Sequence, residues 1–283
     1  MKIAHLLLVH KSPRQLGRLV ALLDHPAFDF YIHIDKKSDE RPFHFLKKRP
    51  NVTFIRKRID IRWGGYGTIA ATLAGFREIS TERYDYINVM SGQDLPLKSP
   101  ADIHKFLSDR KGSEFITCLR LSDEWEEALP RIRDYHLVNW KMYGKYRLQK
   151  VVNGLMPVRR FPEGFVPVGR SNWFTLSAEA VRYILGFTRQ NPAFVRYFHY
   201  CWGADEIMFP TILYNSHFRS SIQENLLHVD WSEGHAHPKV FTTHDLPELQ
   251  NSDKLFARKF DEEIDCEVIE QLALGVLRPN LLA

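Results

Sequence analysis

Apolar and amphipathic segments alternate along the first third of the chain. Four segments predict strands, at residues 3–9, 28–35, 52–55 and 84–90. Residues 3–9 are a continuous apolar run, as expected for a strand covered on both faces of a sheet, whereas residues 28–35 are β-rich and alternating. Capping residues and apolar periodicity predict helices at residues 12–23, 68–79 and 99–109. The alternation predicts an α/β fold with a doubly wound, mainly parallel sheet, whose ligand site lies at the carboxyl ends of the strands.

The second half of the chain departs from this alternation. Residues 120–165 are basic and aromatic and show no regular pattern. Further on, we predict strands at residues 171–176 and 225–231, and helices at residues 177–187, after Asp205, and at 262–273. Because no linker or repeat separates the halves, we predict a single domain over residues 1–283 with a modified C-terminal half.

The composition is that of a soluble globular protein, with 44% hydrophobic and 26% charged residues. The sequence has no run of eighteen apolar residues, and its first 13 residues read as a buried strand rather than a signal peptide. Cys118, Cys201 and Cys266 are widely spaced and form no CxxC motif, which fits a reducing cytoplasm. We therefore expect a cytoplasmic protein.

The chain is basic, with a net charge of +5 and a pI near 9.0. This charge indicates an acidic partner, which could be nucleic acid, an anionic membrane surface or a phosphorylated small molecule. Charge alone does not choose among the three.

Polar residues follow two predicted strands. Asp35 ends the strand at 28–35, and Asp94 lies in the loop after the strand at 84–90. Either carboxylate could bind a ligand or simply form a turn. Between these strands, Gly64 and two neighbouring glycines let the backbone approach a ligand before a helix begins, although the spacing matches neither GxGxxG nor a P-loop.

Two charged pairs in the second half are candidates for chemistry. Asp205 and Glu206 border a nearly all-apolar segment, where an acid either favours the start of a helix or acts as a partly desolvated general base. Arg258 and Lys259 stand between two phenylalanines, a setting that suits the diphosphate of a nucleotide, with Lys239 as a third cation. The alternative for this pair is that the cations extend over apolar surface into solvent.

The sequence predicts no metal site. His235 and His237 have no third ligand nearby, and neither an HExxH motif nor an Asp-x-Asp motif at a strand end is present. The absence of GxSxG also disfavours an α/β-hydrolase.

Eight stretches between residue 6 and about residue 261 are informative when taken in order. They read LLLVHKSP, YIHIDKKS, RWGGYGTI, YINVMSGQDLPLKS, FPEGFVPVGRSNWFTLSAEAVRYI, WGADEIMFPTIL, NLLHVDW and LFARKFD. Together they resemble the core-2/I-branching N-acetylglucosaminyltransferase and peptide O-xylosyltransferase family. The RWGG, SNWF and FARKF segments look closer to the xylosyltransferase branch.

The resemblance implies a GT-A-type, Rossmann-like glycosyltransferase that uses a UDP-sugar, inverts the anomeric centre and needs no metal. Its nucleotide-binding half would be residues 1–118, and its acceptor-binding and catalytic half residues 119–283. Glu206 matches the family's catalytic base, and Arg258 and Lys259 match the basic side chains that replace a metal on the diphosphate.

The resemblance also implies which residues bind the donor and the acceptor. For the donor these are Val9, His10, Asp35, Trp63, Gly64 and Lys239. For the sugar and the acceptor we expect Asp94, Asn172, Trp173, Trp202 and Asp205, with Asn172 standing where the xylosyltransferase branch has Asp.

We expect transfer of xylose or N-acetylglucosamine to a hydroxyl of a glycan or lipid-linked glycan, in bacterial surface polysaccharide synthesis. Residues 137–160 are expected to touch the inner face of the membrane. One rival is a glycoside hydrolase that uses Asp94 and Glu206 as paired carboxylates. The other is a non-enzymatic basic binder of carbohydrate or nucleic acid, although RRM, KH and helix-turn-helix signatures are missing, and we expect no nucleic-acid partner.

Overall fold

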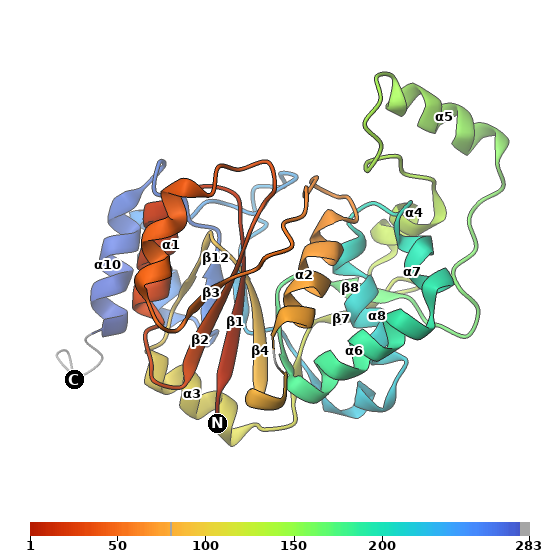
Figure 1. Cartoon of the computed structure of the whole chain (residues 1–283). Helices are drawn as coiled ribbons and strands as arrows, with labels where there is room; N and C mark the ends of the chain where they lie inside the picture. Colours follow the sequence, from red (N-terminus) through yellow and green to blue (C-terminus); the bar gives the residue numbers. More distant parts are fainter. Residues whose placement is uncertain (80, 278–283) are drawn as a thin grey trace.

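The computed structural model describes residues 1–79 and 81–277, and its centre is a seven-stranded sheet of order β10-β6-β9-β4-β1-β2-β3. The strands are β1 (Ile3–Val9), β2 (Phe28–Ile34), β3 (Val52–Phe54), β4 (Tyr86–Ser91), β6 (Glu114–Phe115), β9 (Phe174–Ser177) and β10 (Ile222–Gln223). β1 pairs in parallel with β2 and β4, β3 is parallel to β2, and β9 runs antiparallel to both β4 and β6. The predicted α/β class with a mainly parallel sheet is confirmed (Figure 1).

Helices cover both faces of this sheet, which is why every position of the strand β1 is buried and all except His5 are apolar. Leu6 and Leu8 point into one core, and Leu7 and Val9 point into the other. The first core is formed with α2 (Gly67–Glu78), α6 (Ala178–Gln190) and α8 (Met208–Tyr214). The second is formed with α1 (Pro13–Leu22), α3 (Pro100–Asp109) and α10 (Cys266–Leu277), so the sheet is doubly wound (Figure 1).

Two small sheets complete the C-terminal half. β5 (Asp94–Pro96), β12 (Phe256–Arg258) and β11 (Leu227–Val229) form one, in which Arg258 lies directly opposite Asp94. β7 (Cys118–Arg120) and β8 (Val168–Arg170) form the other. The first of these sheets brings two candidate residues together that are far apart in the sequence.

The basic middle region, for which no regular pattern was found in the sequence, contains two helices. α4 (Leu129–Arg133) packs on the body, whereas α5 (Lys145–Leu155) has no buried residue and stands away from it (Figure 1). The other helical elements are α7 (Pro192–Phe198), α9 (Leu246–Asn251) and the short 3-10 segments η1 (Arg41–Lys48), η2 (Thr81–Arg83), η3 (Glu126–Ala128), η4 (Ala204–Glu206), η5 (His217–Ser221) and η6 (Thr243–Asp245).

The extent of the domain stays a prediction, and residues 80 and 278–283 of the predicted span lie outside the described residues. Among the described helices, none combines the length and the apolar character needed to cross a bilayer.

Candidate active site

The first part of the site lies where β1 and β2 end. Val9 is buried, and its carbonyl accepts a hydrogen bond from the amide of Asp35 at 2.7 Å. The Asp35 carboxylate accepts the Lys37 amide at 2.9 Å, so it does form the turn that was one of its two interpretations. The next residue after Val9, His10, is exposed, and its pKa is lowered by desolvation and by the charges of Lys11, Lys259 and Arg258. His10 and the basic pair therefore face the same region.

The glycine-rich loop packs against the segment that carries the acids. The amide of Gly203 donates to the carbonyl of Gly64 at 2.8 Å. Gly64 has φ of 71°, and a Cβ there would lie 2.5 Å from Nε1 of Trp202. Trp202 meets the exposed ring of Trp63 edge-on, with 5.0 Å between ring centroids. Both tryptophans thus lie close to the segment that carries the acids.

Glu206, in this segment, forms an ion pair with Arg131. Nη1 of Arg131 donates to Oε2 of Glu206 at 2.6 Å, and the guanidinium lies between the rings of Trp125 and Trp202, 4.8 and 4.7 Å from their centroids. Burial raises the pKa of Glu206 to about 7, the charge of Asp205 adds to this, and Arg131 opposes it. The Glu206 side chain is still 26% exposed. A reachable carboxyl with a pKa near neutrality suits a general base.

Asp205 does not start α8, which begins at Met208 after Ile207. It lies in the single turn of η4, where Oδ2 accepts a hydrogen bond from Nδ2 of Asn172 at 3.2 Å. Burial raises its pKa, against the effects of Asn172, Thr68 and Arg131. The predicted sugar-binding residues Asp205 and Asn172 are therefore brought together, directly beside Glu206.

Trp173, which follows Asn172, connects the neighbourhood of Asp205 and Glu206 with that of Arg258 and Lys259. The Arg258 guanidinium lies 4.9 Å from the centroid of a Trp173 ring, and its Nη1 donates to Oδ1 of Asp94 at 2.7 Å. Asp94 is 0% exposed, and its second oxygen accepts the Ser91 amide at 2.8 Å. The predicted direct contact of Asp94 with a substrate does not fit this burial, and its carboxylate instead positions Arg258. A carboxylate without exposed surface is equally unable to be half of a hydrolase pair.

Lys259 differs from its neighbour, since it takes part in none of the ion pairs among the described residues. Burial lowers its pKa, and the charges of Arg258 and Lys11 lower it further. The segment is held by Phe260, whose carbonyl accepts from buried side-chain amides of α1 and of the β4–β5 turn, Gln15 at 3.0 Å and Gln93 at 3.2 Å. The structure thus fixes a concentrated positive charge, which favours an anionic ligand.

Lys239 lies near this segment, but its charge is compensated. Its ammonium is 2.6 Å from Oδ1 of Asp245 and 3.8 Å from Oδ2 of Asp230. The hydrogen bond that its ammonium donates to Asp245 is the largest cause of its raised pKa. The predicted role of Lys239 as a third phosphate-binding cation does not fit this pairing, because two carboxylates already neutralise it.

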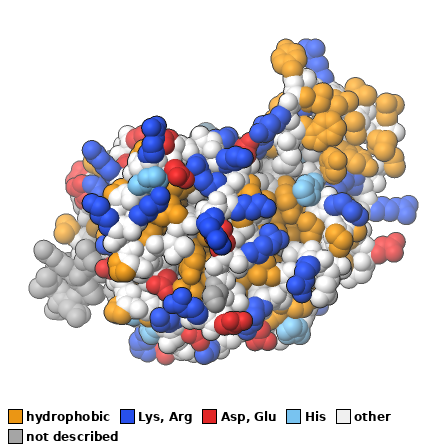
Figure 2. Space-filling view, in the orientation of Figure 1, with side chains coloured by type: hydrophobic (Ala, Val, Ile, Leu, Met, Phe, Trp, Pro, Cys, Tyr) orange, Lys and Arg blue, Asp and Glu red, His pale blue; other side chains and the backbone are white. Residues whose placement is uncertain are grey.

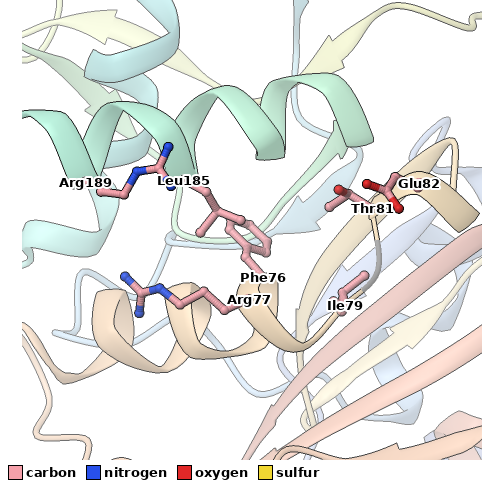
Figure 3. Close-up of a pocket in the computed structure, with 7 residues that line it drawn as sticks. All are labelled: Phe76, Arg77, Ile79, Thr81, Glu82, Leu185 and Arg189. Atoms are coloured by element: carbon pink, nitrogen blue, oxygen red, sulfur yellow. The ribbon is translucent and has the colours of Figure 1, made fainter.

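A depression between α2 and α6 is separate from the site (Figure 3). It is lined by Phe76, Arg77, Ile79, Thr81, Glu82, Leu185 and Arg189. These residues cluster at the C-terminal end of α2, whereas Thr68, which influences Asp205, lies at its N-terminal end. The described part of the chain contains no group of three or more His, Cys, Asp or Glu side chains that could hold a metal ion.

A family model described as "Branch: Core-2/I-Branching enzyme" matches residues 3–252. The chain belongs to the Core-2/I-Branching enzyme family. The resemblance seen in the sequence is confirmed, as is the α/β fold with a doubly wound, mainly parallel sheet. The GT-A type stays a prediction.

Relatives of this Core-2/I-Branching enzyme family member include xylosyltransferases. Xylosyltransferase oxt of Drosophila pseudoobscura pseudoobscura is 26% identical over 301 residues, which cover 96% of this chain and 33% of the relative. Xylosyltransferase 2 of Homo sapiens is 27% identical over 302 residues, with 96% and 33% covered. The chain therefore spans about a third of the length of these relatives. Among solved structures, galactosyltransferase LgtC in complex with donor and acceptor sugar analogs is 9% identical, with a TM-score of 0.46 over 95% of both chains.

Three residues that contribute to the site were not predicted from the sequence. Arg131 and Trp125 lie in the region without a pattern, and only the packing of α4 against η4 brings the guanidinium to Glu206, 75 residues away. Lys11, which pairs with Asp261 at 2.5 Å, follows β1 and has no motif of its own. Lys11 could have been predicted, because it is a basic residue that closely follows a strand leading into the site. The sequence around Arg131 has no comparable feature.

Proposed function

We propose that this protein is an inverting glycosyltransferase that moves a sugar from a UDP-sugar to a hydroxyl group of an acceptor glycan. The observation that carries the proposal is a continuous series of residue contacts between a candidate base and a cationic segment. Glu206 follows Asp205, Asp205 binds Asn172, and Trp173 lies under Arg258. A base at one end and fixed cations at the other are the two groups that such a transfer requires.

The reaction is a single displacement. Glu206 takes the proton of the acceptor hydroxyl as its oxygen bonds to the anomeric carbon of the sugar. The bond between that carbon and the diphosphate oxygen breaks, and UDP leaves with the electron pair, so the anomeric configuration inverts. Arg258 and Lys259 stabilise the negative charge that develops on UDP, in the manner of preorganised cations in a water-poor cleft. In this scheme Val9, His10, Asp35, Trp63 and Gly64 surround the nucleotide.

The donor sugar is proposed to be xylose or N-acetylglucosamine, and the xylosyltransferase relatives support the first. The acceptor is proposed to be a glycan or a lipid-linked glycan of a bacterial surface polysaccharide, modified on the cytoplasmic side of the membrane without a metal ion. The buried, Arg258-bound carboxylate of Asp94 supports transfer over glycoside hydrolysis, since hydrolysis needs a second reachable carboxyl group.

A panel of UDP-sugars, scored by thermal shift and by slow donor hydrolysis, tests the proposal. UDP and the true donor should raise the melting temperature, whereas GDP and free sugars should not. The protein should release UDP from one or two donors only. A protein that ignores every UDP compound, or that cleaves preformed glycosides instead, would rule the proposal out.

A further inference from the structure

Residues 139–160, which we call the arm, expose an unusual amount of apolar surface. In Figure 1 the arm carries α5 away from the body, and in Figure 2 hydrophobic side chains gather on it with Lys and Arg around them. Tyr143 is 103% exposed and Leu155 is 81% exposed. The other large exposed side chains of the arm are Trp140, Met142, Tyr146, Val151, Met156 and Val158. An apolar patch of this kind on a monomer marks an interaction surface.

The arm is also strongly cationic. It contains six Lys and Arg residues and no Asp or Glu. The remainder of the chain has 33 Lys and Arg residues and 34 Asp and Glu residues, so it is nearly neutral. Arg147, Lys150 and Arg160 are exposed, and their side chains bind no other described residue. Their charges are therefore available to an anionic partner.

The arm is held in place by polar contacts on its inner side. Asn153 accepts from the Tyr135 amide at 2.7 Å and donates to the Tyr135 carbonyl at 3.0 Å. Gln149 accepts from the Leu137 amide at 2.9 Å. Because Gln149 and Asn153 are four positions apart on α5, they share one face, and the apolar and cationic side chains are left to solvent.

The arm starts and ends beside the candidate active site. Nη1 of Arg62 donates to the carbonyl of Trp140 at 3.0 Å, and the next residue, Trp63, contacts Trp202. The Arg159 amide donates to the Arg133 carbonyl at 2.9 Å, at the end of the helix that carries Arg131. A surface that held the arm would thus lie close to Glu206.

We propose that the arm docks on an anionic lipid surface and so presents a lipid-linked acceptor to Glu206. Aromatic and aliphatic side chains enter the boundary between headgroups and acyl chains, and the unpaired cations bind the anionic headgroups. Two copies of the arm would repel one another, since each carries six cations and no acid. The docking rests on the arm alone, whereas the delivery of the acceptor rests on the proposed function.

Vesicle co-sedimentation tests the docking. The wild-type protein should sediment with vesicles of phosphatidylcholine and phosphatidylglycerol at low salt, more weakly at high salt, and least with phosphatidylcholine alone. Leu155→Glu and Lys150→Glu should each lower the partition coefficient about tenfold or more. The matched controls are Leu274→Glu, at a side chain of α10 that is 55% exposed, and Lys105→Glu on α3, and both should bind like the wild type.

Three outcomes would overturn the docking. They are wild-type protein that stays in solution with anionic vesicles at low salt, arm variants that sediment like the wild type, and a dimer in sedimentation velocity that Leu155→Glu dissociates. The last would make the arm a protein interface. Calorimetry with UDP in the absence of vesicles separates the two proposals, because arm variants should keep wild-type UDP affinity. A protein that binds vesicles but not UDP refutes the proposed function and leaves the docking standing.

Discussion

The surroundings of Glu206 and of Lys259 share one property and differ in another. Burial shifts both groups toward their neutral forms, since it raises the pKa of Glu206 and lowers that of Lys259. However, the compensating charge touches Glu206 itself, through Arg131, whereas at the basic segment Asp94 touches only Arg258. The proton affinity of Glu206 is therefore raised by burial and by Asp205 against the opposing charge of Arg131, whereas Lys259 forms no ion pair with any other described residue.

The largest effect is expected for Glu206→Gln, which keeps the shape of the side chain and removes its basicity. Transfer should fall about 10²–10⁴-fold, the contribution of a positioned base, while UDP affinity stays unchanged because the basic segment is intact. Initial rates and calorimetry measure the two quantities. Glu127→Gln, at an exposed carboxylate near Arg170, is the matched control. A Glu206→Gln variant that keeps more than a few per cent of the rate would exclude Glu206 as the base.

Lys259→Ala should have the opposite profile. The loss of a charge-assisted hydrogen bond to the diphosphate should weaken UDP binding about 10–100-fold, with a smaller effect on the rate at saturating donor. Calorimetry measures the affinity, and Lys105→Ala on α3 removes a cation far from the site as a control. If Lys259→Ala keeps the wild-type affinity for UDP, Lys259 does not bind the diphosphate, and the contrast between Lys259 and Glu206 no longer holds.

Arg131 permits a finer test, through the pH dependence of kcat/KM. In the wild type the rate should rise with pH through about 7, because Glu206 must lose its proton to act as a base. Arg131 lowers the pKa of Glu206, so Arg131→Met should move this limb to higher pH and cost most activity below neutrality. Arg131→Lys should restore the limb, and Arg133→Met on the same helix should leave it in place. A loss of equal size at every pH would indicate a structural role only.

The sequence predicted five of the seven strands of the central sheet because their signal is local, and it missed the two-residue strands β6 and β10. A continuous apolar run such as residues 3–9 needs no knowledge of its neighbours to be read as a buried strand. α5 was not predicted, since its helical stability comes from Asn153 and Gln149 binding a neighbouring segment rather than from an apolar stripe.

The site was less accessible to prediction than the sheet. Glu206 was chosen from the family resemblance, and the residues by themselves left a helix start as an equal alternative. The pairing of Asp94 depends on which strand meets which, as in the register of Arg258 against Asp94, and the pairing of Lys239 depends on the loop conformation that brings it to Asp245. Composition cannot supply such contacts, because the partners are 164 residues apart in one case.

The smallest effect is expected for metal removal. Arg258 and Lys259 are proposed to carry out the charge stabilisation that a divalent ion provides in many transferases, so treatment with EDTA should leave the transfer rate unchanged. Lys259→Ala refines this test, since added Mn²⁺ should not replace the lost ammonium if no metal-binding side chains face the diphosphate. If the chelated enzyme recovers activity only when Mn²⁺ is added, the basic segment assists a metal ion rather than replacing it. The metal ion, and not Lys259, would then be the main positive charge to compare with Glu206.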